Sequence, residues 1–225
     1  MTKQKIALGD MSADRAEALR LFPLPVEIVA RLAIYAELLV KWQRTINLVA
    51  AASLPQLWTR HFADSLQVQA AAPAARLWAD LGSGAGFPGL VTAIRLADEP
   101  GAKVHLIESD QRKAAFLREV SRETKAPAEI HQGRIEDVLP RLGRLDAVSA
   151  RALAPLPLLI AYAAEALENG ATGVFLKGQT LADELTALQA TDTLAHYELS
   201  VIRSRTAQAG QLLLVKRKIP DISGG

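Results

Sequence analysis

Four glycines follow a short hydrophobic segment in the stretch WADLGSGAGFPGL, at residues 78–90. A glycine-rich loop lets the backbone approach a ligand closely, and it accepts positive φ angles that other residues resist. Two spacings overlap in this stretch, G-x-G-x-G from Gly82 and G-x-G-x-x-G from Gly84. The first suggests a nucleoside-sulfonium site with Gly82 and Gly84 at the ligand, whereas the second is the dinucleotide fingerprint.

Two acidic residues bear on the choice between these ligands. Glu108 ends the hydrophobic segment KVHLIE, where a carboxylate can accept hydrogen bonds from ribose hydroxyls in either kind of site, or simply cap a helix. Asp80 comes directly before the loop. Its carboxylate would repel a pyrophosphate but tolerate the cationic groups of S-adenosylmethionine, so Asp80 favours the sulfonium ligand. A hydrogen bond that braces the loop would also explain Asp80.

Three later segments carry further candidate residues. In GRIEDV, Ile135 could pack on an adenine ring, and the backbone of Ile135 and Glu136 could form hydrogen bonds with the edge of that ring. A helix that begins here would explain the acidic residues Glu136 and Asp137 equally well. Arg151, in DAVSARALAPL, suits a carboxylate, a phosphate or the O6/N7 edge of guanine, unless it is an exposed loop residue. Lys177, in FLKGQ, could bind a phosphate or could simply be a solvent-exposed lysine at the end of a strand.

Hydrophobic periodicity predicts the elements that must position these residues. Amphipathic helices at 25–42 and 54–70 indicate a helical N-terminal part. Beyond it, strands alternate with helices, which predicts a mostly parallel sheet covered on both faces. The last two strands, 195–203 and 211–218, must pair antiparallel because their link is too short for a crossover. The remaining predicted strands are 76–81, 103–108, 128–132, 145–150 and 172–177, and the predicted helices are 89–96, 110–124, 135–142, 156–167 and 180–190.

This order of elements is the pattern of an α/β Rossmann-like class I methyltransferase fold, a seven-stranded sheet that ends in an antiparallel hairpin. Dinucleotide domains usually end on parallel strands, so the hairpin also favours the G-x-G-x-G spacing. We therefore predict a helical extension at 1–72, a cofactor-binding methyltransferase domain at 73–220 and a frayed tail at 221–225. The basic residues of helix 110–125 alternate with Glu119 and Glu123, which predicts a solvent-exposed face.

Composition excludes several kinds of chemistry. The chain has no cysteine among its 225 residues, which excludes disulfides, thiolate metal sites and cysteine nucleophiles. Its four histidines show no metal-ligand spacing, so no metal is expected. No run reaches the roughly 18 apolar residues of a membrane span, and the first residues do not form a secretory signal. We expect a soluble, cytoplasmic monomer, and the net charge of +2 permits a polyanionic partner without requiring one.

The chain resembles the RsmG family, also called glucose-inhibited division protein B, whose members methylate N7 of a guanine in 16S ribosomal RNA. The resemblance covers nearly the whole chain from about residue 35 onward and rests on the order and spacing of six motifs. They are INLVA at 46–50, RHFADSL at 60–66, DLGSGAGFPG at 80–89, RIED at 134–137, SARALAPL at 149–156 and LKGQ at 176–179.

The resemblance implies S-adenosylmethionine as the cofactor and 16S ribosomal RNA, free or in the small subunit, as the partner. It implies cofactor contacts at Gly82, Phe87, Ile135, Glu136 and Arg151. Guanine N7 has a free lone pair and no proton to lose, so no general base is expected. We accordingly expect Arg151 to be the positioning group at cofactor and base.

The same resemblance leaves the RNA-contacting residues open. Arg60 and His61 could face RNA, as could Lys177, whereas the neighbouring Asp64 and Ser65 could equally join the N-terminal helices to the sheet. Two other functions stay open on the sequence: a dehydrogenase that uses NAD or NADP, and a non-catalytic RNA-binding assembly factor on a methyltransferase scaffold.

Overall fold

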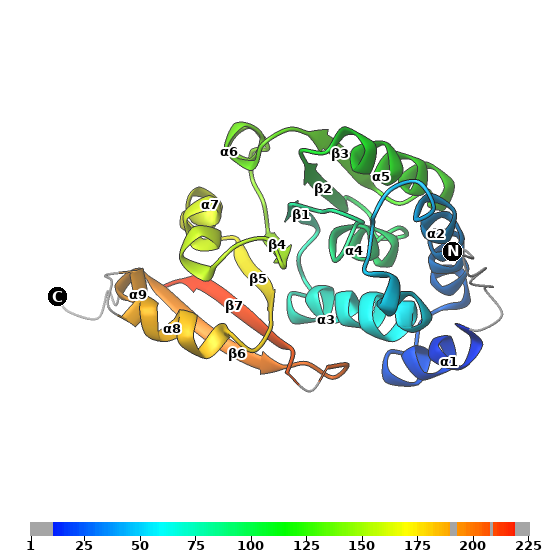
Figure 1. Ribbon diagram of the computed structural model, residues 1–225. Helices are drawn as coiled ribbons and strands as arrows, with labels where there is room; N and C mark the ends of the chain where they lie inside the picture. The colour runs from blue at the N-terminus through cyan, green and yellow to red at the C-terminus, as the bar shows by residue number, and fades with distance from the viewer. Residues whose placement is uncertain (1–10, 190–192, 208, 219–225) are drawn as a thin grey trace.

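The computed structural model describes residues 11–189, 193–207 and 209–218. Its centre is a seven-stranded sheet in the order β3-β2-β1-β4-β5-β7-β6 (Figure 1). The first five strands in that order are parallel, and β7 pairs antiparallel with both β5 and β6. This confirms the predicted sheet and its closing hairpin. The strands are β1 (Leu77–Leu81), β2 (Lys103–Glu108), β3 (Ala128–Gln132), β4 (Ala147–Arg151), β5 (Thr172–Lys177), β6 (Tyr197–Arg203) and β7 (Gln211–Arg217).

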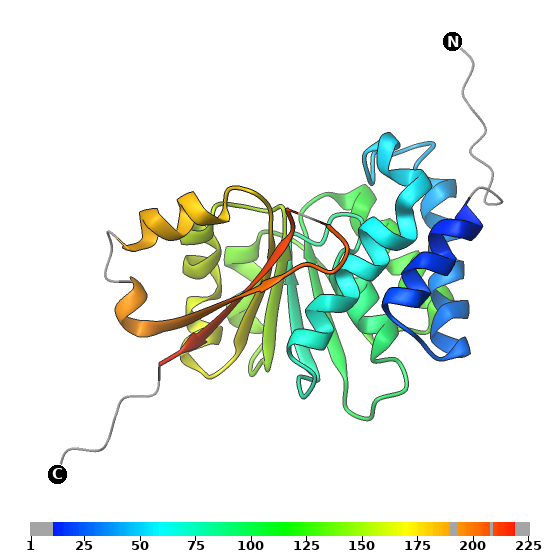
Figure 2. The same ribbon diagram turned by 90° about the horizontal axis from the view of Figure 1, so that it is seen from below.

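Helices cover both faces of this sheet (Figures 1 and 2). Successive side chains of a strand point to opposite faces, so Trp78 joins the core under the N-terminal helices while Leu81 joins the core under α7. No helix in the described residues is long and apolar enough to cross a membrane. The α-helices are α1 (Ser12–Leu21), α2 (Val26–Trp42), α3 (Asp64–Ala71), α4 (Gly89–Arg95), α5 (Gln111–Thr124), α6 (Ile135–Val138), α7 (Leu156–Glu168), α8 (Leu181–Gln189) and α9 (Thr193–His196).

The helix expected at 54–70 is divided into three segments. A 3₁₀ turn, η2 (Ala51–Gln56), contains Pro55, a π-helical turn, η3 (Trp58–Ala63), follows, and α3 completes the stretch. The Asp14 carboxylate of α1 accepts hydrogen bonds from the backbone N–H groups of Trp58 and Thr59 at 2.7 and 3.2 Å. These bonds satisfy donors at the start of the wider turn, and π-helical turns are frequent at functional sites.

Two short helices, α1 and α9, were not predicted. Helix α1 buries only Ala18 among its own residues, so its sequence lacks the apolar spacing of an amphipathic helix. Ala18 and Leu19 pack against the core, and Asp14 adds polar contacts to η3. A further 3₁₀ turn, η4 (Leu139–Arg141), ends the stretch predicted as one helix at 135–142. The predicted tail at 221–225 lies outside the described residues.

The charged face of α5 is solvent-exposed at Arg112, as predicted, whereas Glu119 is half-buried. Glu119 accepts a hydrogen bond from the Trp42 indole at 2.7 Å and pairs with Lys41. Arg112 donates to the Thr45 carbonyl at 2.5 Å. Charged side chains of α5 thus hold the end of α2, and the hydrophobic core runs without interruption from α2 into the sheet.

The glycine loop rests on a buried contact between β1 and β4. Asp80 and Ser149 are register partners, and the Ser149 hydroxyl donates to Asp80 Oδ1 at 2.7 Å. Burial raises the pKa of Asp80 to about 6, and the bond from Ser149 opposes that rise. Asp80 does not line the cavity described below, so it braces the loop. Gly89 packs directly against it, because a Cβ at Gly89 would lie 2.2 Å from Leu106 Cδ2 and 2.6 Å from Asp80 Cβ.

We predict that Gly89→Ala lowers the free energy of unfolding by about 1–3 kcal/mol, because the added methyl group overpacks the junction of β1, β2 and α4. Gly178→Ala is the matched control, since a Cβ there meets nothing within 4 Å. Urea denaturation measures both. Equal stabilities for the two variants would show that the junction has room to spare.

The raised pKa of Asp80 also predicts a pH dependence. The folded state binds a proton more tightly than the unfolded state, so this residue's contribution to stability increases as pH falls from about 6 toward the unfolded value near 3.8. Asp80→Asn removes that contribution. The difference in unfolding free energy between wild type and Asp80→Asn should therefore shift by about 2–3 kcal/mol in favour of wild type between pH 7 and pH 4. Parallel pH profiles would contradict the assignment.

Candidate functional site

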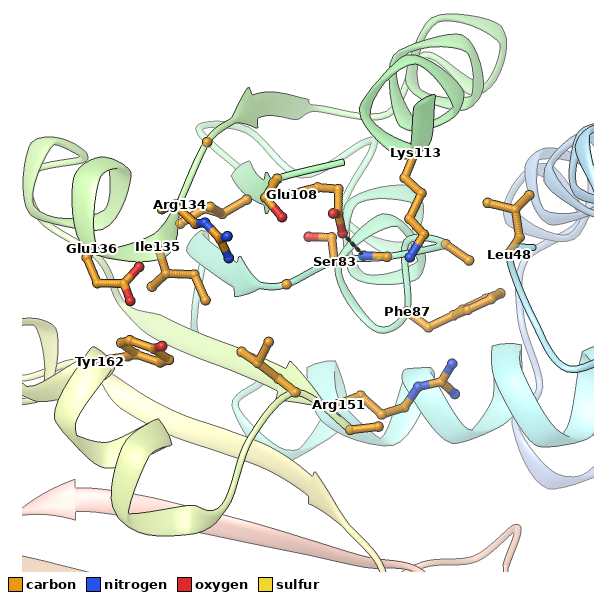
Figure 3. A pocket seen from close by; sticks show the side chains of 18 residues that line it. Leu48, Ser83, Phe87, Glu108, Lys113, Arg134, Ile135, Glu136, Arg151 and Tyr162 are labelled. Atoms are coloured by element: carbon orange, nitrogen blue, oxygen red, sulfur yellow. Dashed lines mark hydrogen bonds between the residues drawn. The ribbon is translucent and has the colours of Figure 1, made fainter. Parts of the chain in front are cut away.

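A cavity of about 420 Å³ opens at the carboxyl ends of β1, β2 and β4 (Figure 3). The strand order reverses between β1 and β4, and ligands of open α/β sheets bind beside such a switch point. The volume lies within the range of small-molecule sites. All seven residues predicted to contact the cofactor line this cavity: Gly82, Gly84, Phe87, Glu108, Ile135, Glu136 and Arg151.

Gly82 and Gly84 have different roles in the glycine loop. Gly82 and Gly84 have φ angles of +62° and +57°, which side chains adopt only at a cost. A Cβ at Gly82 would also lie 2.5 Å from Leu153 Cδ1, whereas a Cβ at Gly84 would come no nearer than 3.8 Å to another atom. Gly82 therefore allows the segment after β4 to close over the loop, while Gly84 leaves open space beside the cavity.

Glu108 joins the loop to the end of β2. Its Oε2 accepts a hydrogen bond from the Gly84 amide at 2.7 Å (Figure 3), and its Oε1 accepts one from the Asp110 amide at 2.8 Å. Because each ionised carboxylate oxygen has more than one lone pair, both oxygens keep capacity toward the cavity. The carboxylate can hold the loop and accept from ligand hydroxyls at once.

The opposite wall comes from α6 and α7. Ile135 and Glu136 project from the start of α6, and Tyr162 of α7 lies next to them (Figure 3). A hydrogen bond between Tyr162 and Glu136 raises the pKa of the tyrosine. Ile135 supplies an apolar surface to this wall.

Several lining residues were not predicted from the sequence. Leu48 falls within the INLVA motif, and Lys113 follows Glu108 by five positions, so each lies close in sequence to a feature that could have pointed to it. Arg134 is the first residue of the RIED motif and comes directly before the predicted contact Ile135. Tyr162 reaches the cavity from the middle of α7, and no spacing in the sequence singles it out.

Arg151 lies at the mouth of the cavity, in contact with the loop and with η3. Its guanidinium is 4.9 Å from the centre of the Phe87 ring, donates to His61 Nδ1 at 3.0 Å and lies 3.9 Å from Asp64 Oδ2. The Phe87 ring in turn stacks on His61 at 4.9 Å. Burial lowers the pKa of Arg151, and Asp64 opposes that shift.

His61 is held as a neutral imidazole. Burial, with help from the charges of Arg151 and Arg60, lowers its pKa to about 3. Since Nδ1 accepts from Arg151, the proton lies on Nε2, which donates to the Ser53 hydroxyl at 2.9 Å. A neutral ring can stack on Phe87 and accept from the arginine without adding a second positive charge.

A second cavity, of about 510 Å³, adjoins the first. Arg151 and Ala152 line both cavities. The three residues predicted to contact RNA, Arg60, His61 and Lys177, all line the second one. The structure thus brings the two predicted sets of residues to opposite sides of a single arginine.

These three residues differ in what their side chains can do. Arg60 is exposed. Lys177 has only 9% of its side chain exposed, and its Nζ lies 2.6 Å from Glu184 Oε2 and donates to the Ala154 carbonyl. Its charge is already compensated, so a direct phosphate contact at Lys177 stays a prediction that would require this pair to open.

Asp64 and Gln67 hold the link between β6 and β7 at the rim of the second cavity. Asp64 Oδ1 accepts from the Thr206 hydroxyl at 2.9 Å, and Gln67 Oε1 accepts from the Arg205 amide at 2.7 Å. Asp64 therefore joins the N-terminal helices to the sheet. This is the structural role that the sequence offered for Asp64 as an alternative to an RNA-facing RHFADSL motif.

The comparisons with known proteins agree with this geometry. The O-methyltransferase TomG from Streptomyces achromogenes, which is involved in tomaymycin synthesis and was solved in complex with SAM, superposes with a TM-score of 0.61 at 18% identity, over 96% of this chain and 99% of that one. At that identity the likeness shows the fold, a class I methyltransferase fold, and no more.

Sequence relatives are much closer. The chain is 52% identical over 188 residues to the ribosomal RNA small subunit methyltransferase G of Nitrobacter hamburgensis, covering 83% of this chain and 72% of the relative. It is 45% identical over 214 residues to the protein of the same name from Methylobacterium nodulans, covering 95% and 98%. The family model described as rRNA small subunit methyltransferase G matches residues 28–213. The chain belongs to the rRNA small subunit methyltransferase G (GidB) family.

Proposed function

We propose that the protein transfers a methyl group from S-adenosylmethionine to N7 of a guanine in 16S ribosomal RNA of the small subunit. The observation that carries the proposal is the pair of adjoining cavities with Arg151 as their common wall. One cavity has the glycine loop and acid of a nucleoside site, and the other is lined by Arg60, His61 and Lys177. Such an arrangement lets one positioned group contact both reactants where they meet.

The first cavity fits S-adenosylmethionine in three respects. Glu108 presents a carboxylate whose oxygens keep lone pairs for ribose hydroxyls. Ile135 offers an apolar face for the adenine ring, and Gly84 leaves room for the rest of the molecule beside the loop. When bound, S-adenosylmethionine supplies a methyl group on a positively charged sulfur, ready for attack by a nucleophile.

The residues around the second cavity suit alignment of a base that needs no deprotonation. Guanine N7 carries a free lone pair, and the described lining of the cavity includes no cysteine. Orientation alone can contribute effective molarities of about 10⁵–10⁸ M. Arg151 is the group best placed to orient the base, because a guanidinium can donate to the O6/N7 edge of guanine; it would do so through O6 while N7 reacts.

We further propose that the protein acts in the cytoplasm as a monomer. Residues of one chain supply the lining of both cavities in the described part of the molecule, so a second copy is not needed to complete the site. The dehydrogenase alternative has no support from the family or from the structural neighbours reported above.

We predict that Glu108→Gln weakens S-adenosylmethionine binding about 10- to 100-fold, because hydrogen bonds to a charged acceptor contribute about 1.5–3 kcal/mol. Isothermal titration calorimetry measures the affinity. Glu99→Gln is the control, since Glu99 pairs with Arg76 away from the cavity, and its affinity should match wild type. Wild-type affinity in Glu108→Gln would remove the ribose contact from the proposal.

Mass spectrometry of digested 16S ribosomal RNA tests the reaction itself. A strain without the gene should lack one methyl group on a guanine, and cleavage chemistry selective for N7-methylguanine should place that methyl at N7 when the gene is restored. Persistence of the modification in the deletion strain would refute the proposal. Cofactor binding without turnover on either naked RNA or small subunits would favour the non-catalytic assembly factor.

A further inference from the structure

Three potential metal ligands meet on the β2–β3 ribbon, outside the cavities described above. His105 Nδ1 and His131 Nε2 lie 2.9 Å apart. Glu129 places Oε2 3.8 Å from His105 Nδ1 and Oε1 3.7 Å from His131 Nε2. One potential ligand atom from each side chain lies within 4.8 Å of those of the other two. None of the three residues lines the cofactor cavity or the cavity beside it.

The strand register explains why residues so far apart in the sequence meet. In the parallel pairing of β2 with β3, His105 is the partner of Glu129 and Ile107 is the partner of His131. Side chains two positions apart on a strand share a face, so all three ligand side chains lie on one face of the sheet. Strand β3 is an edge strand (Figure 1). Sequence spacing alone could not reveal the cluster, since His105 and His131 come from different strands.

The geometry is close to that of a tetrahedral zinc site. Two nitrogens bound to one zinc ion at about 2.0–2.1 Å lie about 3.3 Å apart. The histidine nitrogens would separate by about 0.4 Å from their present 2.9 Å, and a carboxylate oxygen would approach by a similar amount. One imidazole must also move its proton to the ring nitrogen that faces away, because only an unprotonated nitrogen can bind a metal.

Exposure and charge at the cluster suit an ion that keeps a water ligand. His105 is buried, whereas the side chains of His131 and Glu129 are 21% and 51% exposed, so an ion can enter from solvent. Lys103 Nζ lies 3.3 Å from Glu129 Oε2. Glu129 can therefore bind a metal through Oε1 while Oε2 keeps the ammonium, an outer contact of the kind that orients metal-bound carboxylates.

We propose that His105, Glu129 and His131 bind a single divalent transition-metal ion of the zinc type. Two imidazoles and one carboxylate form a donor set that zinc accepts, with a fourth position left for water. The ion would join the edge strand β3 to β2. The site lies about 10 Å along β2 from Glu108, at about 3.3 Å per residue, so it reinforces the strand that carries the ribose-binding acid without entering the cofactor cavity. The expectation from sequence that the chain has no metal site is replaced by this proposal.

Calorimetric titration of the full-length, metal-free protein with zinc chloride tests the proposal. Wild type should bind one zinc ion per chain at micromolar concentration, and cobalt should give the visible absorption bands of a four- or five-coordinate site. Loss of a ligand in His131→Ala or in Glu129→Gln should weaken binding at least tenfold. His196→Ala is the matched control, because His196 is exposed and precedes β6, at the opposite edge of the sheet; it should bind zinc as wild type does.

Thermal denaturation supplies a second readout, which does not depend on the heat of binding. An ion that binds only the folded state raises its stability in proportion to the logarithm of its concentration above the dissociation constant. Zinc should therefore raise the Tm of wild type and of His196→Ala, each compared with the same protein without metal, but should leave the Tm of His131→Ala unchanged. Equal zinc binding by every variant, or no saturable binding by wild type at micromolar zinc, would overturn the proposal.

Discussion

A largely buried positive charge at the end of β4 links the parts of this molecule. The guanidinium of Arg151 lies away from bulk water, where an unpaired charge is costly. Its partners come from two other segments: His61 and Asp64 from the N-terminal helices and Phe87 from the glycine loop. The charge is therefore stabilised only when helices, loop and sheet are all in place.

The partners of Arg151 are themselves held by further contacts. Asp64 accepts from Thr206 in the link between β6 and β7, and His61 donates to Ser53 in η2. Tyr35 of α2 stacks on Phe87 at 5.4 Å and donates a hydrogen bond to the Ala85 carbonyl. The helical N-terminal part thus forms a wall of the site, which gives it a role beyond covering one face of the sheet.

Much of this architecture could be predicted from the sequence because it depends on local patterns. The strand-helix alternation, the short link before the last strand and the glycine spacing are all local, and they predicted the sheet, its hairpin and the glycine loop of the first cavity. The cofactor contacts at Phe87, Ile135, Glu136 and Arg151 were expected from the family resemblance. Gly89, the last glycine of the G-x-G-x-x-G spacing, packs against Leu106 and Asp80 and does not line the cofactor cavity.

What could not be predicted depends on contacts between distant segments. The wide turn of η3 depends on Asp14, and the position of Tyr162 depends on how α7 packs. The grouping of His105 with His131 depends on strand register. In each case the partner lies far along the chain, and no periodicity identifies it.

The most direct test of Arg151 as the common wall compares cofactor affinity with the rate of methyl transfer in Arg151→Lys. Lysine keeps the positive charge but lacks the planar fork of donors, and a misplacement of about 1 Å can cost about 100-fold in rate. We expect transfer to 16S ribosomal RNA to fall about 100-fold while the dissociation constant of S-adenosylmethionine changes less than about tenfold. Transfer at the wild-type rate, or a loss explained entirely by weaker cofactor binding, would contradict this account.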